Sequence, residues 1–202
     1  MAISRSTRTA SGSTFGIFLL GIVFTLVALF AAAFMYFRYG HPPVATADAA
    51  FPFEKQIVRV PLGARIDREM QQPPFGTSEQ VFESGARMYA SSCASCHGVP
   101  GHDTAYAKYM YPTTPQLWHK HGKGSVVGVS DDDAGETYWK IANGIRLTGM
   151  PAFDHIYSTT QMWQIALLLK NADQPLPDPV MQLLEAPANA SAGPSMPALQ
   201  HP

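Results

Sequence analysis

The chain has two cysteines, Cys93 and Cys96, and both stand in the segment CASCH, where His97 follows the second one directly. In this spacing each thiol can add to one vinyl group of a haem while the histidine turns its imidazole toward the iron. The pattern C-x-x-C-H therefore predicts one covalently attached haem c. A zinc site is one alternative, but it needs more ligands and the sequence has no third cysteine. A redox dithiol is another, and it would normally lie in an alternation of strands and helices that is missing here.

The second axial ligand of the iron has to come from elsewhere in the chain. We predict Met150, in the segment TGMPAF, because its neighbours Gly149 and Pro151 favour an extended turn that can lay a thioether over the haem face. Met88 and Met162 fall on amphipathic patterns, where packing explains them. Histidine with methionine would raise the reduction potential and close both axial positions, so that the iron passes electrons without binding a substrate. The open alternatives are one methionine and four histidines: Met110, His102, His119, His121 and His155.

Three amphipathic helices are expected to position these residues, and no strand alternation of useful length accompanies them, so the predicted fold class is all-α. The helix boundaries follow from capping residues, from acids that favour the N-terminal end of the helix dipole, and from a glycine stop. The helices run from a cap at Thr77 or Ser78 into Cys93, from Asp131–Asp133 to Gly144, and from a cap at Ser158 or Thr159 over residues 162–171. Residues 98–130 form a long irregular stretch, which a large buried cofactor would explain.

Five segments are predicted along the 202 residues: an N-terminus at 1–14, a transmembrane helix at 15–37, a linker at 38–76, the haem-binding helical domain at 77–173 and a disordered tail rich in Pro and Ala at 174–202. Six prolines between residues 42 and 74 are expected to prevent any long helix in the linker, leaving short extended pieces such as residues 56–60. Seven prolines in the tail argue against a packed core there.

Residues 15–37 carry no charge and, at about 1.5 Å rise per residue, reach roughly 35 Å, enough to cross a hydrocarbon core of about 30 Å. A cleaved secretory signal is the alternative, but the apolar part of a signal peptide is typically about 7–15 residues long. Arg5 and Arg8 before the run, against Arg38 after it, favour a cytoplasmic N-terminus by a small margin.

Composition excludes some classes of function. The first 40 residues hold three of the 14 basic residues and no acidic one, so the rest of the chain carries 11 basic and 15 acidic residues. Such a mildly acidic domain is not expected to bind nucleic acid. No acid–base pair, nucleophile or nucleotide-binding loop stands out, so substrate catalysis by the chain alone is not expected.

With these motifs the domain resembles the class I cytochrome c family, especially the single-haem bacterial membrane cytochromes with a Gly-Met-Pro loop. The resemblance rests on GARMYASSCASCHG at 85–98, on YWKIANGIRLTGMPAF at 138–153 and on the last helix with Trp163. It implies that Gly85 and Tyr89 of the first helix cross the last helix near Trp163 and Leu168, with Gly85 permitting a close approach. It also implies that Pro112 and Leu117 edge the haem. For the haem propionates, the candidate partners are Arg146, Lys120, His119 and Trp118.

The resemblance further implies a single-pass protein of the bacterial inner membrane, whose haem carries single electrons on the periplasmic side. Its expected partners are membrane-bound respiratory complexes, such as a quinol-oxidising complex or a terminal oxidase, or periplasmic redox proteins such as a dehydrogenase. By itself the chain would be an electron-transfer protein and not an enzyme. Two alternatives stay open: a fixed haem-bearing subunit of a larger membrane oxidoreductase complex, and a haem enzyme or gas sensor with an open coordination site.

Overall fold

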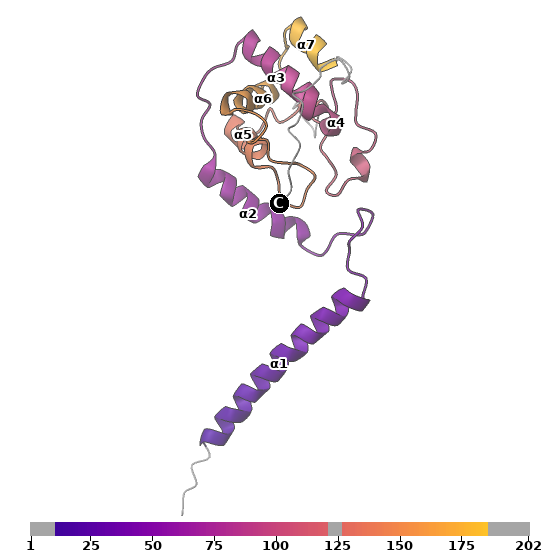
Figure 1. The fold of residues 1–202 in the computed structure, drawn as a ribbon, viewed down its shortest axis with the longest axis vertical. Coiled ribbons are helices and arrows are strands. Elements are labelled where there is room, and N and C mark those ends of the chain that lie inside the picture. Colours follow the sequence, from indigo (N-terminus) through magenta and orange to yellow (C-terminus); the bar gives the residue numbers. More distant parts are fainter. Residues whose placement is uncertain (1–10, 121–126, 186–202) are drawn as a thin grey trace, which may run out of the picture. The chain divides into compact units, whose positions relative to one another are not determined.

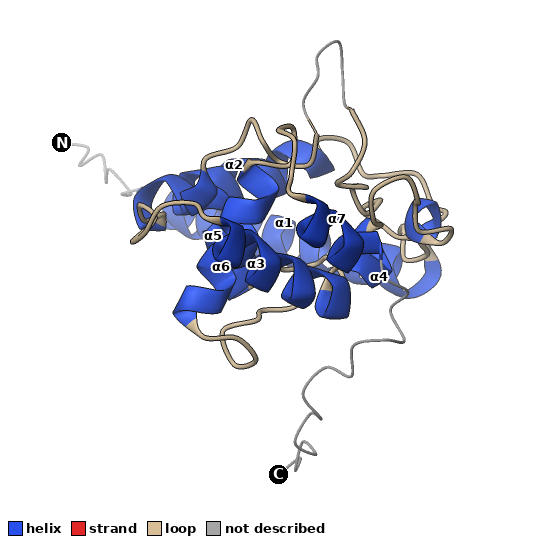
Figure 2. Ribbon diagram, turned by 90° about the horizontal axis from the view of Figure 1, so that it is seen from above, coloured by secondary structure: helices blue, strands red, loops and turns tan. Residues whose placement is uncertain are grey.

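A computed structural model of the chain describes residues 11–120 and 127–185, and it divides into two compact units, one ending at Ala50 and one starting at Phe51. All the regular elements that these residues form are helices, so the predicted all-α class is confirmed (Figure 2). The elements are α1 Ser11–Tyr39, α2 Glu54–Glu69, α3 Glu79–Ser92, α4 Ala94–His97, the 3-10 turn η1 Ala107–Tyr109, α5 Ala134–Asn143, α6 Thr159–Lys170 and α7 Asp178–Glu185.

The first unit contains α1. Among the described residues, Thr14–Tyr39 is the one stretch long and apolar enough to cross a membrane, judged by length and composition. The Thr25 hydroxyl donates to the Gly21 carbonyl at 2.8 Å, so this polar group is paired inside the helix, as a membrane core requires. These features are consistent with the predicted single-pass anchor. Residues 1–10 of the predicted N-terminal segment lie outside the described residues.

The core of the second unit is built where α3 crosses α6, with α5 and α7 packed alongside (Figure 1). At the crossing, a Cβ added to Gly85 would lie 2.5 Å from the backbone oxygen of Gln164, so only glycine lets the two backbones come this close. Tyr89, one turn later, is fully buried, and so is Leu168 on the opposite helix. The structure therefore confirms the close crossing that the family resemblance implied.

The helix ends follow the predicted capping residues. The Ser78 hydroxyl accepts the Val81 amide at 3.3 Å, and the Asp133 carboxylate accepts the Gly135 amide at 2.7 Å. Ser158 forms a capping box with Gln161 at the start of α6. Apart from η1, the described part of 98–130 contains no helix, which confirms the irregular stretch.

The expectation that prolines would prevent a long helix before residue 77 is wrong, because α2 spans 16 residues with Pro61 inside it. Proline lacks the amide that would bond to the carbonyl one turn back, so this helix depends on tertiary contacts. Ile66 is buried, and the Trp139 indole of α5 donates to the Glu69 carboxylate at 2.9 Å. The Arg65 guanidinium also lies over the Trp139 ring, 5.6 Å from its centroid. The packing of α2 on α5 therefore offsets the missing hydrogen bond.

The predicted disordered tail at 174–202 is also wrong over its first part, because α7 packs against α3 at residues 178–185. Val180 and Leu184, one helical turn apart, are both fully buried. Pro177 precedes the helix and Pro179 lies in its first turn, where the amides have no partner within a helix, so these prolines start the helix and do not break it. The domain thus extends past its predicted end at 173, and residues 186–202 lie outside the described residues.

The Gly85 crossing yields a first prediction. Gly85→Ala is expected to lower the free energy of unfolding by about 1–3 kcal/mol, because the new methyl group must push the Gln164 carbonyl away. Urea unfolding followed by circular dichroism in detergent measures the effect. Gly63→Ala, in a helix with no atom within 4 Å of the added Cβ, is the control and should cause no loss. Equal stability of Gly85→Ala and the wild type would show that the crossing is looser than described.

A second prediction concerns α7. Leu184→Ala is expected to cost about 2–5 kcal/mol, since it leaves a cavity where α7 meets α3. Gln182→Ala, at an exposed position of the same helix, should leave the unfolding midpoint in place. If both variants unfold like the wild type, α7 does not belong to the folded domain.

Candidate functional site

The second unit contains an open cavity of about 1160 Å³, counting the part that faces solvent. The part of it that compares with ordinary ligand pockets, which hold about 300–1,000 Å³, is about 260 Å³, so a large ligand would have to extend to the open side of the cavity. Its wall is formed by the end of α3, by α4, by residues 110–117, by α5, by residues 145–153 and by α6. Most of the wall is apolar, through Leu117, Val129, Ile141, Ile145, Phe153, Ile165 and Leu169.

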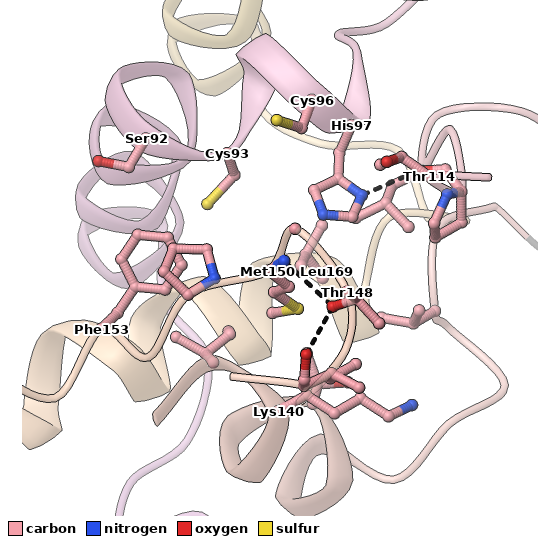
Figure 3. Close-up of a pocket in the computed structure, with 18 of the residues that line it drawn as sticks. Ser92, Cys93, Cys96, His97, Thr114, Lys140, Thr148, Met150, Phe153 and Leu169 are labelled. Atoms are coloured by element: carbon pink, nitrogen blue, oxygen red, sulfur yellow. Dashed lines mark hydrogen bonds between the residues drawn. The ribbon is translucent and has the colours of Figure 1, made fainter. Parts of the chain in front are cut away.

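The three residues of the C-x-x-C-H motif meet on one side of this cavity. Cys93 ends α3, and Cys96 and His97 follow within the single turn of α4. Spacings of three and four residues place side chains on the same helix face. In Figure 3 the Cys93 sulfur and the His97 ring point from this turn toward the loop that carries Met150. The structure thus brings both thiols and the imidazole to one wall of the cavity.

The alternatives for the cysteines find little support in this geometry. Burial, with a smaller contribution from Cys96, raises the pKa of the Cys93 thiol to about 12, whereas exchange-active cysteines have lowered pKa values. Among the described residues, no cluster of three or more His, Cys, Asp or Glu side chains could hold a metal ion by itself. A neutral thiol at Cys93 that faces an apolar space is instead suited to joining an apolar ligand.

The His97 ring has a fixed orientation. Its Nδ1 lies 2.8 Å from the Pro115 carbonyl oxygen and donates its proton there, since a carbonyl can only accept. Burial lowers the pKa of His97 and outweighs the opposite effect of this hydrogen bond, so the ring is neutral at pH 7. The lone pair then resides on Nε2, which is free to bind a metal, an arrangement common among metal-binding histidines. The Leu117 amide donates to the His97 carbonyl at 3.0 Å and keeps the loop in place.

Met150 reaches the cavity from a closed turn. The Thr148 hydroxyl donates to the Ile145 carbonyl at 2.7 Å and accepts the Met150 amide at 3.1 Å (Figure 3). The Ile145 amide in turn donates to the Met150 carbonyl at 3.2 Å. Gly144, with a φ of 64°, ends α5 and lets the chain enter this turn. The turn thus fixes the backbone of Met150 with its side chain on the cavity wall.

A second contact ties the methionine segment to the cysteine segment. The Tyr157 hydroxyl lies 2.6 Å from the Ser92 hydroxyl and 3.1 Å from that of Ser91, both at the end of α3. Tyr157 itself packs on Phe153, three residues after Met150, with ring centroids 6.0 Å apart. The two walls that carry Cys93 and Met150 are therefore joined at their edge.

The other candidate residues from the sequence fall into two groups, those that line the cavity and those that do not. Met110 does line the cavity, but Met88 and Met162 are buried in the helical core. Pro112 and Leu117 line the cavity, as the resemblance implied. The remaining candidates with described positions do not line it: His102, His119, His155, Arg146, Lys120 and Trp118. His121 lies outside the described residues.

Two polar wall residues of α5 escaped the sequence reasoning. Lys140 and Thr137 of α5 line the cavity beside Ile141. The Lys140 ammonium group bonds to the Glu136 carboxylate at 2.6 Å and to that of Asp132 at 3.0 Å. The spacing of four residues between Glu136 and Lys140 was the available signal for the first pair. In Figure 3 the Lys140 nitrogen points away from Met150, so the carboxylates keep the charge out of the cavity.

Comparison with known proteins adds the family context. A family model described as "Cytochrome C oxidase, cbb3-type, subunit III" matches residues 80–169. The match runs from α3 nearly to the end of α6 and includes Cys93, Cys96, His97 and Met150. None of the curated proteins compared with the chain matches it. Residues 80–169 are therefore similar to a cytochrome c domain, a helical module that binds haem and transfers electrons.

The Lys140 pairs predict a pH dependence. Burial alone would lower the pKa of Lys140, but Glu136 and Asp132 outweigh it, so this pKa lies above its usual value. The pairs therefore stabilise the fold fully below the unfolded pKa of about 10.4, and their contribution is lost as the pH rises through the folded pKa. Between about pH 8 and about pH 11 the wild type should lose more stability than Lys140→Met, measured by urea unfolding. Parallel losses in both proteins would contradict this assignment.

Proposed function

We propose that the cytochrome c domain binds one haem c through thioether bonds to Cys93 and Cys96, with His97 and Met150 as the axial ligands of the iron. One observation carries the proposal. Two separate segments line the same apolar cavity: the first supplies two thiols and one neutral imidazole, and the second supplies one thioether. This donor set fits a haem, because the thiols match its two vinyl groups and the imidazole and thioether match the two open positions of the iron.

When bound, haem c supplies a reversible one-electron couple at iron. The chain contributes a wall of aliphatic and aromatic side chains that excludes water, and low water access is one of the levers that sets the potential of a haem. The hydrogen bond from Nδ1 to the Pro115 carbonyl holds the His97 ring with Nε2 available for the iron. The Thr148 hydroxyl holds the turn that presents Met150.

Met150 is preferred over Met110, although both line the cavity. The Met110 sulfur already accepts a hydrogen bond from the Thr114 hydroxyl at 3.1 Å. A Cβ added to Gly149 would lie 3.0 Å from the Met110 methyl group, so Met110 packs directly against the turn that carries Met150. We therefore assign packing to Met110 and ligation to Met150.

The function that follows is transfer of single electrons without substrate chemistry. With histidine and methionine on the iron, no position stays open for a substrate or a gas. In this proposal the candidate span at Thr14–Tyr39 tethers the domain to a membrane, which we place as the bacterial inner membrane with the haem on the periplasmic side. A tether confines the haem near membrane-bound respiratory complexes and raises its effective concentration toward them. These complexes, or periplasmic redox proteins, are the proposed partners.

A fixed subunit of a membrane oxidase complex is the second candidate, because the matching family model is described as an oxidase subunit. Purification of the full chain in mild detergent, followed by sedimentation, distinguishes the two. Recovery of the chain only within a large complex favours the subunit, and recovery as a separate haem protein favours the mobile carrier.

The proposed ligands give a direct test on the full-length protein. After unfolding on a denaturing gel, haem stain should stay with the wild type and with Met150→Ala, because the thioether bonds survive denaturation. It should be lost from a variant with Cys93→Ser and Cys96→Ser. In solution, oxidised Met150→Ala should lack the methionine-to-iron charge-transfer band, and the reduced form should bind carbon monoxide, which the wild type binds poorly.

Met110→Ala serves as the matched control and should keep the charge-transfer band. Loss of this band in Met110→Ala with its retention in Met150→Ala would reverse the assignment of the axial ligand. A wild-type chain without haem stain would refute the proposed function as a whole.

A further inference from the structure

The helix α2 carries apolar side chains on two opposite faces. On one face Ile66 is buried, and Val58 and Leu62, at spacings of four residues before it, are partly buried. On the other face Ile57 and Val60 are each 69% exposed. A surface helix normally keeps polar side chains on the side that faces solvent. A second apolar side therefore indicates contact with something outside the folded unit.

An exposed phenylalanine extends this second side at the start of the helix. Phe53, one turn before Ile57, is 73% exposed. It also has a φ of 62°, a left-handed conformation that bulky residues rarely adopt. Within the second unit its side chain gains little burial to offset this backbone strain. Phe53, Ile57, Val60 and the exposed Ala64 follow one another at spacings of three and four residues, and together they form the outer face of α2.

The direction of the outer face is fixed by contacts at both ends of the helix. The Tyr111 hydroxyl donates to the Glu54 carboxylate at 2.8 Å at the start of α2, and the Trp139 indole donates to the Glu69 carboxylate at 2.9 Å at its end. Within the second unit α2 lies beside α5 (Figure 1). The helix therefore cannot turn its outer face inward without breaking these hydrogen bonds and exposing Ile66.

We propose that the outer face of α2 binds the surface of a lipid bilayer, with Phe53, Ile57 and Val60 at the boundary between headgroups and acyl chains. This inference rests on the membrane tether of the proposed function. Amphipathic helices that lie in this boundary bury their apolar face about 5–10 Å deep, and Phe and aliphatic side chains are typical of that face.

The position of α2 in the chain favours a bilayer as the occupant. The candidate span ends at Tyr39 and α2 starts at Glu54, so 14 residues join them. At about 3.5 Å per residue these residues reach at most roughly 50 Å. The tether thus keeps α2 near the membrane surface at a high effective concentration. A short apolar face that would bind weakly from bulk solution can then stay bound.

No charged residue interrupts the outer face in the part of α2 that follows the linker. The charged residues of this part, Glu54, Lys55 and Arg59, fall on other sides of the helix. Along the outer face the first charge is Asp67, which comes one turn after Ala64. Moving a carboxylate into acyl chains is costly, so the bound part of the helix ends near Ala64.

Binding of α2 to a bilayer would also orient the cavity that lines up Cys93 and Met150. Trp139 of α5 bonds to α2, and Ile141 of the same helix lines the cavity. The tilt of the cavity relative to the membrane plane is then set by the contact between α2 and the lipid. A fixed tilt presents the same edge of the domain to each membrane-bound partner, which relaxes the orientational limit on productive encounters.

The test uses the full-length, haem-loaded protein in vesicles of phosphatidylethanolamine and phosphatidylglycerol, with a nitroxide spin label on Ala64→Cys. This label leaves Phe53, Ile57 and Val60 in place. It should be more accessible to oxygen, which concentrates in acyl chains, than to a water-soluble nickel chelate present on both sides of the vesicle. The same label on Gln182→Cys, at an exposed position of α7, is the control and should favour the nickel chelate.

A pair of variants separates lipid contact from a change in the fold. Adding Ile57→Ser and Val60→Ser to the labelled protein should lower the ratio of bound to free helix by at least about tenfold, because two apolar side chains are lost from the contact. The nickel chelate should then reach the label at position 64. Ile57→Leu with Val60→Leu keeps the face apolar and should preserve the protection.

Equal nickel access at positions 64 and 182 would overturn the proposal and leave the outer face of α2 to a protein partner. Protection that persists with both serines would overturn it too. Spin–spin broadening between labels at position 64 would assign the face to a second copy of the chain. Failure of the proposed function is seen separately, because a chain without its tether would not float with carbonate-washed vesicles, and one without haem c would not keep haem stain.

Discussion

The close contact between α3 and α6 is the interaction on which the rest of the domain depends. Gly85 lets the backbone of α3 approach the Gln164 carbonyl, and this distance sets where the far end of α3 lies. Cys93 ends that helix, so the position of both thiols and of His97 relative to the α5–α6 wall follows from a contact two turns away. The helices that form the cavity wall cannot move apart without opening the core around Trp163 and Leu168, and this fixes the width of the cavity.

The cavity wall combines an apolar surface with polar groups that are almost all paired within the protein. Lys140 is held by two carboxylates, His97 by the Pro115 carbonyl and Thr148 by its own turn. Such a site suits a group that gains or loses one electron. The charges at its edge are already neutralised, so few polar groups of the protein have to reorganise when the charge of the bound group changes.

In the linker and the tail, the rule that proline breaks helices led to a wrong prediction, because both segments contain a helix. Proline does break helices in isolation, but Pro61 is tolerated because α2 gains contacts with Trp139 and buries Ile66. Near residue 178 the prolines stand at the start of a helix, where a missing amide costs nothing. Composition alone could not reveal that Val180 and Leu184 face a hydrophobic surface on α3, because that surface exists only after α3 and α6 have packed.

The sequence by itself determined the features that short-range chemistry controls. The spacing of Cys93, Cys96 and His97 predicted the haem motif, and the caps at Ser78, Asp133 and Ser158 predicted the starts of three helices, because a cap bonds to amides only two or three residues away. Only the tertiary structure brought Met150 and Thr137 to the same cavity as Cys93, showed that Lys140 is neutralised, and placed α2 and α7 on the domain. Except for the local ion pairs of Lys140, these outcomes depend on contacts between residues far apart in the chain, and no local pattern records them.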